Sequence, residues 1–206
     1  MTLAALPWFL ASYLVGAFPT SYLAGKIFKG IDLRQHGSKN LGATNVYRVL
    51  GWKFAVPVAI VDILKGTLPV VAFAPHVSSS TRVAMLVGAM AVLGHVFSIF
   101  VGGKGGKGVA TATGVMLGLA PAAVGICMLV WLVLVKTTGY VSLGSMLGAA
   151  ALPIGLLVLH PDRRELVLPS VALAALIIFL HRANIRRLLN GTENRFGRRA
   201  APGATA

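Results

Sequence analysis

The amino-acid sequence predicts an all-α, polytopic integral membrane protein with seven transmembrane helices, some of them short. Hydrophobic residues make up 56% of the 206 residues, and the mean hydropathy is +0.81. These residues fall in long runs, most of which match the about 20 residues that a helix needs to cross a bilayer. Lys and Arg number 19 against 5 Asp and Glu, an excess that is typical of the cytoplasmic loops of membrane proteins. We therefore expect no nucleic-acid partner.

Six hydrophobic runs give the expected elements in chain order, at residues 3–24, 54–74, 83–100, 109–136, 140–159 and 166–181. The first run is interpreted as a span that the protein retains, because no Lys or Arg precedes Lys26 and a signal peptide needs a basic start. The fourth run has 28 residues, which is too long for one span and short for two, and Pro121 lies near its middle.

The positive-inside rule decides how often the fourth run crosses the membrane. Six basic residues lie between residues 24 and 53, and six arginines follow residue 181. Both groups reach the cytoplasmic side only if the fourth run splits near Pro121 into two short helices. The prediction is therefore seven spans, with the N-terminus outside and the C-terminus cytoplasmic. We expect a single domain at residues 1–199 and a disordered tail at residues 200–206.

Residues 102–108 read Gly-Gly-Lys-Gly-Gly-Lys-Gly and separate the third run from the fourth. Glycine lets backbone N–H groups turn inward, and lysine adds positive charge, so the loop is a candidate cradle for a phosphate. A dinucleotide-binding fold is rejected because no βαβ unit surrounds the loop, and the spacing also fails the P-loop pattern. We expect the loop to lead into a helix at Val109.

A second polar cluster lies at residues 37–51. Ser38 and Asn40 are residue types that cap helices, and residues 43–50 are predicted to form two helical turns that end at Gly51. Thr44 and Arg48 are four residues apart and share a helix face, so Arg48 can add a bidentate charged contact to an anion. The alternative is an interfacial helix with ordinary caps.

The remaining polar residues stand at the ends of apolar runs or inside them. His95 precedes the glycine loop, where a hydrogen-bonded structural histidine is the alternative to a functional one. His181, Asn184 and Glu193 follow the last run in a basic helix that is predicted to stop at Gly191, and a lipid-facing anchor explains some of its arginines.

Two charges lie inside the second run, Asp62 and Lys65, and each would cost about 3 kcal/mol alone in a membrane. We expect a structural ion pair or two groups facing a wet cavity, with a proton relay as the alternative. Ser142, at the start of the fifth run, could line the same cavity. The only cysteine, Cys127, lies in an apolar run, which excludes a disulfide and a thiol metal site.

Three segments together resemble the bacterial acyl-phosphate:glycerol-3-phosphate acyltransferases, the PlsY family. They read G-S-x-N-x-G-A-T-N-x-x-R-x-x-G at 37–51, G-H-x-F-x-x-F-x-G-G-K-G-G-K-G-V-A-T at 94–111 and H-R-x-N-I-x-R-L-L-x-G-x-E at 181–193. Lys39 departs from the family, which usually has Gly there. The resemblance implies a multi-pass enzyme of the bacterial cytoplasmic (inner) membrane whose site faces the cytoplasm.

The same resemblance implies the reaction and its partners. The enzyme would acylate the 1-hydroxyl of sn-glycerol 3-phosphate from a fatty acyl phosphate, giving lysophosphatidic acid and phosphate, among membrane lipids. Neither acyl-CoA nor acyl carrier protein would be the direct donor, and no cofactor or metal ion is expected. Acyltransferases of the acyl-CoA type pair a His with an acidic residue five positions later, which only His160 and Glu165 approach here, in a loop that is expected outside.

By resemblance, Ser38, Arg48 and Lys104 would hold the glycerol phosphate. The polar parts of the site would be oriented by His95, His181, Asn184 and Glu193. Further substrate contacts are expected from the loop glycines, through their N–H groups, and from neighbouring polar residues: Asn40, Thr44, Asn45, Gly102, Gly103, Gly105, Gly106, Lys107, Gly108 and Ser142. A substrate phosphate oxygen could accept the hydroxyl proton, and His95 or His181 is the alternative base.

Two other functions fit parts of the sequence. A transporter or channel for an organic phosphate would use the same basic loops, but it would place polar residues along a path through the membrane. A non-catalytic binder of anionic lipid explains basic loops and leaves the clustered Gly, Asn and His unexplained.

Overall fold

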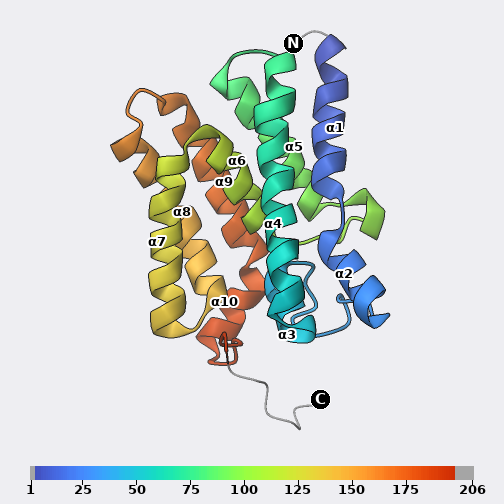
Figure 1. Cartoon of the computed structure of the whole chain (residues 1–206). Coiled ribbons are helices and arrows are strands. Elements are labelled where there is room, and N and C mark those ends of the chain that lie inside the picture. The colour runs from blue at the N-terminus through green and yellow to red at the C-terminus, as the bar shows by residue number, and fades with distance from the viewer. Residues whose placement is uncertain (1–2, 198–206) are drawn as a thin grey trace.

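The computed structural model describes residues 3–197, and all regular secondary structure in that part of the chain is helical (Figure 1). The α-helices are α1 (Leu6–Ala17), α2 (Thr20–Lys29), α3 (Ala43–Leu50), α4 (Trp52–Leu68), α5 (Thr81–Val96), α6 (Val109–Leu119), α7 (Pro121–Thr138), α8 (Val141–Leu159), α9 (Val167–Leu180) and α10 (Arg182–Leu189). Short 3₁₀ segments lie at Leu3–Ala5, Ala74–His76, Ile99–Val101 and Arg164–Leu166, and a π-helical turn lies at Pro69–Phe73. The all-α prediction is confirmed; the expected limit at residue 199 and the tail at residues 200–206 lie outside the described residues.

Several helices are long and apolar enough to cross a membrane. Within residues 3–197 there are five such stretches: Leu3–Lys29, Trp52–His76, Thr81–Val101, Pro121–Thr138 and Val141–Leu159. A sixth is added if α9 and α10, which are bent by 58° at His181, form one span. Helix α6 has 11 residues, so it rises only about 16 Å, roughly half of a bilayer's hydrocarbon core. The protein is therefore a multi-pass membrane protein, whereas the count of seven spans and the orientation of the termini stay predictions.

The fourth hydrophobic run breaks where its sequence predicted a break. Ala120 has φ −151°, and Pro121 occupies the first turn of α7, where its missing N–H costs no hydrogen bond. The expectation of two short helices was wrong for the second one. Helix α7 has 18 residues and continues to Thr138, because Gly139 ends it only there in a left-handed conformation with φ +78°.

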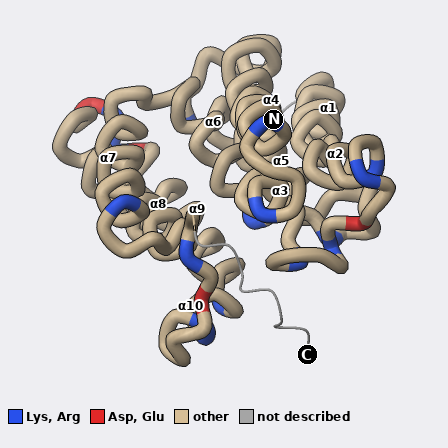
Figure 2. The backbone as a smooth tube through the Cα atoms, turned by 60° about the horizontal axis from the view of Figure 1, so that its bottom comes forward, with Lys and Arg blue, Asp and Glu red and all other residues tan. Residues whose placement is uncertain are grey.

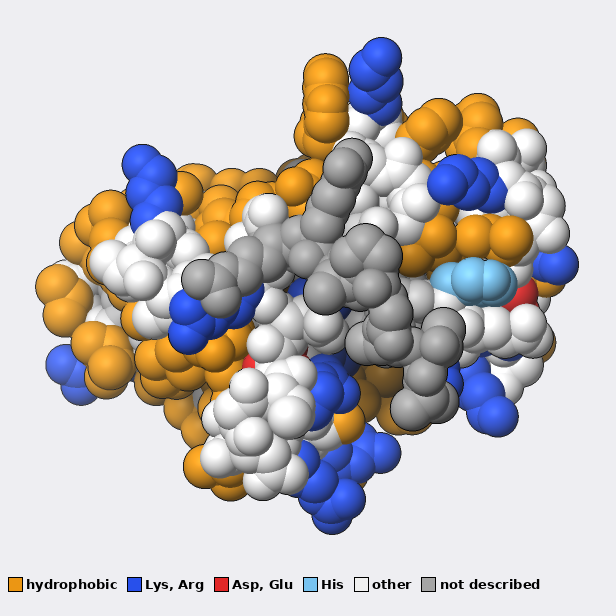
Figure 3. Space-filling model, turned by 90° about the horizontal axis from the view of Figure 1, so that it is seen from below, with side chains coloured by type: hydrophobic (Ala, Val, Ile, Leu, Met, Phe, Trp, Pro, Cys, Tyr) orange, Lys and Arg blue, Asp and Glu red, His pale blue; other side chains and the backbone are white. Residues whose placement is uncertain are grey.

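One end of the helix bundle carries the short helices α2, α3 and α10, and residue 3 lies at the opposite end (Figure 1). Lys and Arg positions gather along these three elements (Figure 2). Seen from this end, basic side chains stand around the rim of the molecule (Figure 3). The basic segments that the sequence analysis assigned to one side of the membrane are thus close together in space.

The helices pack closely where glycine removes the side chain. A Cβ atom at Gly16 of α1 would lie 2.0 Å from the Ala91 carbonyl oxygen of α5. A Cβ at Gly66 of α4 would lie 2.0 Å from the Thr111 carbonyl oxygen of α6. These pairs bring backbones into contact, as small residues do between membrane helices.

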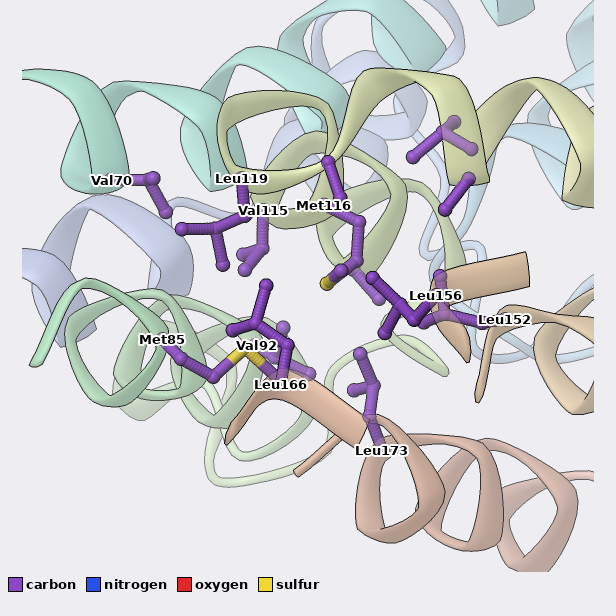
Figure 4. Packing of buried hydrophobic residues seen from close by; sticks show 14 of the residues in the cluster. Val70, Met85, Val92, Val115, Met116, Leu119, Leu152, Leu156, Leu166 and Leu173 are labelled. Carbon is purple, nitrogen blue, oxygen red and sulfur yellow. The ribbon is translucent and has the colours of Figure 1, made fainter. Parts of the chain in front are cut away.

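A hydrophobic cluster holds the centre of the bundle together. Figure 4 shows Val92 of α5, Met116 of α6, Leu156 of α8 and Leu173 of α9 meeting there, and all four are buried. Because two of them, Met116 and Leu173, also border the cavity described next, this packing fixes the apolar wall of the candidate site.

Candidate active site

One cavity of about 330 Å³ collects residues from eight helices, α3 to α10. Its lining divides into two parts. The polar residues of the lining include Ser38, Asn40, Thr44, Asn45, Arg48, Asp62, His95, Lys107, Ser142, Ser145, His181, Asn184 and Glu193. The apolar residues include Met116, Val124, Cys127, Met128, Trp131, Leu152, Leu173 and Ile177. A cavity with cationic and amide groups in one part and apolar side chains in the other suits an amphiphile with an anionic head.

Helix α3 has the bounds that the sequence predicted, Ala43–Leu50, and its C-cap is Gly51 with φ +92°. Its N-cap is Gly42, so Ser38 and Asn40 do not cap it as expected, and both border the cavity instead. Lys39, between them, has φ +58°, a left-handed conformation that favours glycine. This explains why a glycine suits the position, and Ser38 and Asn40 keep their places despite the lysine.

Asn45 supports the loop that carries Ser38. Its side chain is 1% exposed, and its Oδ1 accepts the backbone N–H of Ser38 at 2.8 Å. Its Nδ2 donates to the carbonyls of Leu33 at 3.1 Å and His36 at 3.0 Å. Because the amide is already bonded on both sides, Asn45 positions this loop, and its substrate contact stays a prediction.

The glycine loop does not form the expected cradle of free N–H groups. Four of its amides donate to the chain itself: Gly102 to Ile99, Gly103 to Ser98, Gly105 to Val96 and Gly106 to His95, over 3.4, 2.8, 3.0 and 3.1 Å. The carbonyls at the end of α5 lack helical partners, and the loop folds back to satisfy them. The prediction that these four glycines present N–H groups to acyl phosphate was therefore wrong. Gly108 does border the cavity, as the N-cap residue of α6, which begins at Val109 as predicted.

The two loop lysines differ in position. Lys104 is exposed and is not part of the cavity lining, so its expected contact with glycerol phosphate is not supported. Lys107 borders the cavity, and its Nζ donates to Asn184 Oδ1. The pKa of Lys107 is lowered to about 8, mainly by burial and also by the positive charges of Arg187 and Arg48, while the negative charge of Glu193 opposes this shift.

Glu193 organises the C-terminal side of the cavity. The residue is 7% exposed, and its Oε1 accepts hydrogen bonds from Asn184 Nδ2 at 2.8 Å and Ser142 Oγ at 3.0 Å. Its Oε2 accepts from Arg187 Nε at 2.6 Å. Arg187 was not among the predicted site residues, although its position three residues after Asn184 places both on one face of α10.

The two predicted histidines occupy different environments. His181 lies at the bend between α9 and α10, and its Nδ1 is 2.8 Å from the Ile177 carbonyl. A carbonyl only accepts hydrogen bonds, so Nδ1 carries the hydrogen and Nε2 of the neutral ring is an acceptor. His95 is buried, with Nδ1 3.9 Å from Asp62 Oδ1. Asp62 also lies 2.8 Å from Lys65 Nζ, which confirms the expected ion pair.

Comparisons with known proteins give the same family that the motifs suggested. Residues 6–191 match the family described as "Glycerol-3-phosphate acyltransferase". A protein of that name from Chlorobaculum parvum is 42% identical over 92% of this chain and 96% of its own length. "Glycerol-3-phosphate acyltransferase 2" of Bacillus anthracis is 47% identical over 90% of this chain and 96% of its own.

Two solved structures also match. PlsY (YgiH), described as an integral membrane glycerol 3-phosphate acyltransferase, is 40% identical in its glycerol 3-phosphate form, with a TM-score of 0.87 over 94% of this chain and 96% of that one. A lysophosphatidic acid form is 37% identical, with a TM-score of 0.82 over 94% of this chain and 95% of that one. The chain belongs to the glycerol-3-phosphate acyltransferase family.

Proposed function

We propose that this protein transfers a fatty acyl group from an acyl phosphate to the 1-hydroxyl of sn-glycerol 3-phosphate, giving lysophosphatidic acid and inorganic phosphate. The observation that carries the proposal is the two-part cavity, which has room for phosphate groups beside an apolar chain. The names of the relatives and the two PlsY forms support the acceptor and the product.

The phosphate groups would bind in the polar part of the cavity. Arg48 and Lys107 supply positive charge there, and Ser38 supplies a hydroxyl close by. Arg187 is already paired with Glu193, so it contributes less free charge. In this arrangement Lys107 takes the contact with glycerol phosphate that the sequence had assigned to Lys104.

The acyl chain would lie against the apolar lining that α6 to α9 provide. Ser142 is at the first turn of α8 in the polar part, and Leu152 of the same helix borders the apolar part. Ten residues of helix separate them, a rise of about 15 Å. An acyl carbonyl near Ser142 would therefore have apolar contacts along most of a fatty chain.

The chemistry needs little beyond positioning, because phosphate is already a good leaving group. The hydroxyl oxygen of glycerol phosphate attacks the acyl carbonyl, the carbon–oxygen bond to phosphate breaks, and inorganic phosphate leaves. Fixed cations hold both phosphates and stabilise the developing charge. A phosphate oxygen of the substrate takes the hydroxyl proton, and the free Nε2 of His181 is the alternative acceptor.

Acyl phosphate is the donor that fits best. The only His with an acidic residue five positions later is His160, with Glu165. His160 follows the last residue of α8, while Ser142 stands at its first turn, so about 27 Å of helix separates them. The His–acid pair of the acyl-CoA mechanism therefore stands far from the polar part of the cavity. We place the enzyme in the bacterial cytoplasmic membrane, with this part facing the cytoplasm.

The test uses the purified protein in detergent with hexadecanoyl phosphate and radiolabelled glycerol 3-phosphate. We expect labelled lysophosphatidic acid to form without CoA or carrier protein, and hexadecanoyl-CoA to give none. Product from the CoA thioester alone would overturn the proposed donor. Absence of product from every donor, with transport of glycerol phosphate by vesicles that contain the protein, would favour the transporter instead.

A further inference from the structure

A second, much smaller cavity lies directly behind the candidate active site. It is bounded by the break between α1 and α2, by α4 and by the end of α5, and its volume is about 10 Å³. That is about the room that one water molecule needs. Asp62 and His95 border both this cavity and the main one, so the two cavities share a wall of titratable side chains.

The groups around the small cavity are polar and buried. Lys65 Nζ is 2.8 Å from Asp62 Oδ1 and donates to the Phe18 carbonyl at 3.0 Å, where Pro19 interrupts the first span. His95 Nδ1 is 3.9 Å from Asp62 Oδ1, which is too long for a hydrogen bond and short enough for a bridging water.

Ser21 gives an independent sign of a bound molecule. It borders the small cavity, is 3% exposed, and its Oγ has no hydrogen-bond partner among residues 3–197. A buried hydroxyl that forms no hydrogen bond costs free energy, and a water molecule in this cavity would supply the missing hydrogen-bond partner.

We propose that the small cavity binds one water molecule between Asp62, Ser21 and His95, and that Asp62 and Ser21 act through it as positioning residues for His95. The water accepts the Nδ1–H of His95 and donates to the Asp62 carboxylate. The Ser21 hydroxyl forms a third hydrogen bond with the same water. These contacts fix the tautomer and the plane of the imidazole at the wall of the main cavity. The proposal rests on the proposed acyl transfer, because it assumes that His95, which borders the main cavity, orients the polar part of that site as the motif resemblance implies.

A double-mutant cycle tests the role of Asp62. Asp62→Asn keeps the size of the side chain and removes its charge, and we expect kcat of acyl transfer to fall roughly 10- to 100-fold. The KM for glycerol 3-phosphate should stay within twofold, because Arg48 and Lys107 hold that phosphate. In a His95→Ala background, Asp62→Asn should cost no further activity, because residues that act through one another are not additive. An equal loss in both backgrounds, which a merely structural role predicts, would overturn the proposal.

Ser21→Ala tests the water site with a milder change and has a matched control. Thr111 is likewise buried, with an Oγ1 that has no partner among the described residues, and it borders neither cavity. We expect Ser21→Ala to lower kcat several-fold in the wild-type background and not in the His95→Ala background, and Thr111→Val to leave kcat unchanged. If Asp62→Asn fails to fold, the comparison of Ser21→Ala with Thr111→Val tests the proposal by itself. Equal effects of these two variants on kcat would refute the water site.

A crystal structure of the protein at a resolution that shows ordered water provides the readout that is independent of activity. Electron density for one water molecule between His95 Nδ1 and Asp62 is the expected result, and an empty or collapsed cavity would overturn the proposal. Wild-type protein that shows the water and no acyl transfer would refute the proposed function alone, so the two failures are distinguishable.

Discussion

Lys107 carries more of the expected phosphate binding than any other residue of the glycine loop, because it is the loop cation that borders the cavity. Lys104 lies three residues earlier in the same glycine-rich setting and is exposed. We expect Lys107→Ala to raise the KM for glycerol 3-phosphate roughly tenfold or more, the effect of losing one charged hydrogen bond. Lys104→Ala is the matched control and should change KM less than twofold. Steady-state kinetics of both variants measure the KM, and equal effects would show that Lys104 also takes part in binding glycerol 3-phosphate.

The pKa of Lys107, lowered by burial to about 8, predicts a dependence on pH. The side chain is charged below that pH and neutral above it, whereas a phosphate monoester, with a second pKa near 6, is already mostly doubly ionised at about pH 7. Anion binding therefore weakens as the pH rises, and kcat/KM for glycerol 3-phosphate should fall roughly tenfold between pH 7 and pH 9. Lys107→Arg should flatten the profile, because arginine keeps its charge; the same decline in that variant would exclude Lys107 as its cause.

Single residues could be predicted from the sequence only as far as their type determines their role. The bounds of α3 followed from the local pattern, and Ser38, Arg48, His181 and Asn184 all border the cavity. The choice between Lys104 and Lys107 could not be made, because it depends on how the loop folds back on α5. Sequence patterns do not show that two of the loop amides, those of Gly105 and Gly106, donate to carbonyls at the end of α5.

At the scale of elements, the glycine loop is a close-packed turn, and its packing can be tested. A Cβ atom at Gly106 would lie 2.1 Å from the Leu41 carbonyl and 2.2 Å from His95 Nε2, so the loop and His95 would have to move. We expect Gly106→Ala to lower both the melting temperature and kcat. Gly125 in α7 has open space around its Cβ position, so Gly125→Ala should be neutral or stabilising by up to about 1 kcal/mol. Thermal unfolding in detergent and the acyl-transfer assay check both; an unaffected Gly106→Ala would show that the loop tolerates a side chain.

The segment after α10 is a strap that ties that helix to two other elements. The Phe196 N–H donates to the Gly139 carbonyl at 2.7 Å, and its ring stacks on Tyr47 of α3 with centroids 4.6 Å apart. Arg195 Nε donates to the Tyr140 hydroxyl at 3.2 Å. The strap holds Glu193 in the wall of the cavity.

A truncation pair tests the strap. Ending the chain after Thr192 removes Glu193 and all of these contacts, so we expect kcat/KM to fall roughly 100-fold or more, as when buried hydrogen-bonded charges lose their partner. Ending the chain after Gly197 keeps every contact described above and should leave kcat/KM within twofold. Equal activity of the two truncated proteins would show that the strap has no part in the site.

For the molecule as a whole, hydrophobic runs and charge predicted the helical membrane architecture. They did not predict where each helix ends or which helices pack together. The break at Pro121 followed from proline chemistry, but the full length of α7 did not, because its end depends on Gly139 rather than on the loss of apolar residues. Only the positive-inside rule suggested that the polar segments lie on one side of the membrane. One cavity brings together residues near 40, 107, 142, 181 and 193. The convergence depends on which helices pack together, as α4 and α6 do at Gly66, and a sequence does not state which helices touch.

The expected orientation in the membrane is the last prediction, and it concerns the whole chain. Cys127 is the only cysteine and is half-buried, so a Cys127→Ala protein offers a background for single introduced cysteines. Lys39 and Lys104 are exposed in segments that flank the cavity. Ser79 and Asp162 are exposed in the loops that precede α5 and α9, at the end of the bundle where α1 begins (Figure 1). Because basic segments stay on the cytoplasmic side, a membrane-impermeant maleimide should label Lys39→Cys and Lys104→Cys only in inverted vesicles. Ser79→Cys and Asp162→Cys should react only in right-side-out spheroplasts. Labelling of Lys39→Cys and Lys104→Cys from opposite sides would contradict a single cytoplasmic site, since both segments flank the same cavity.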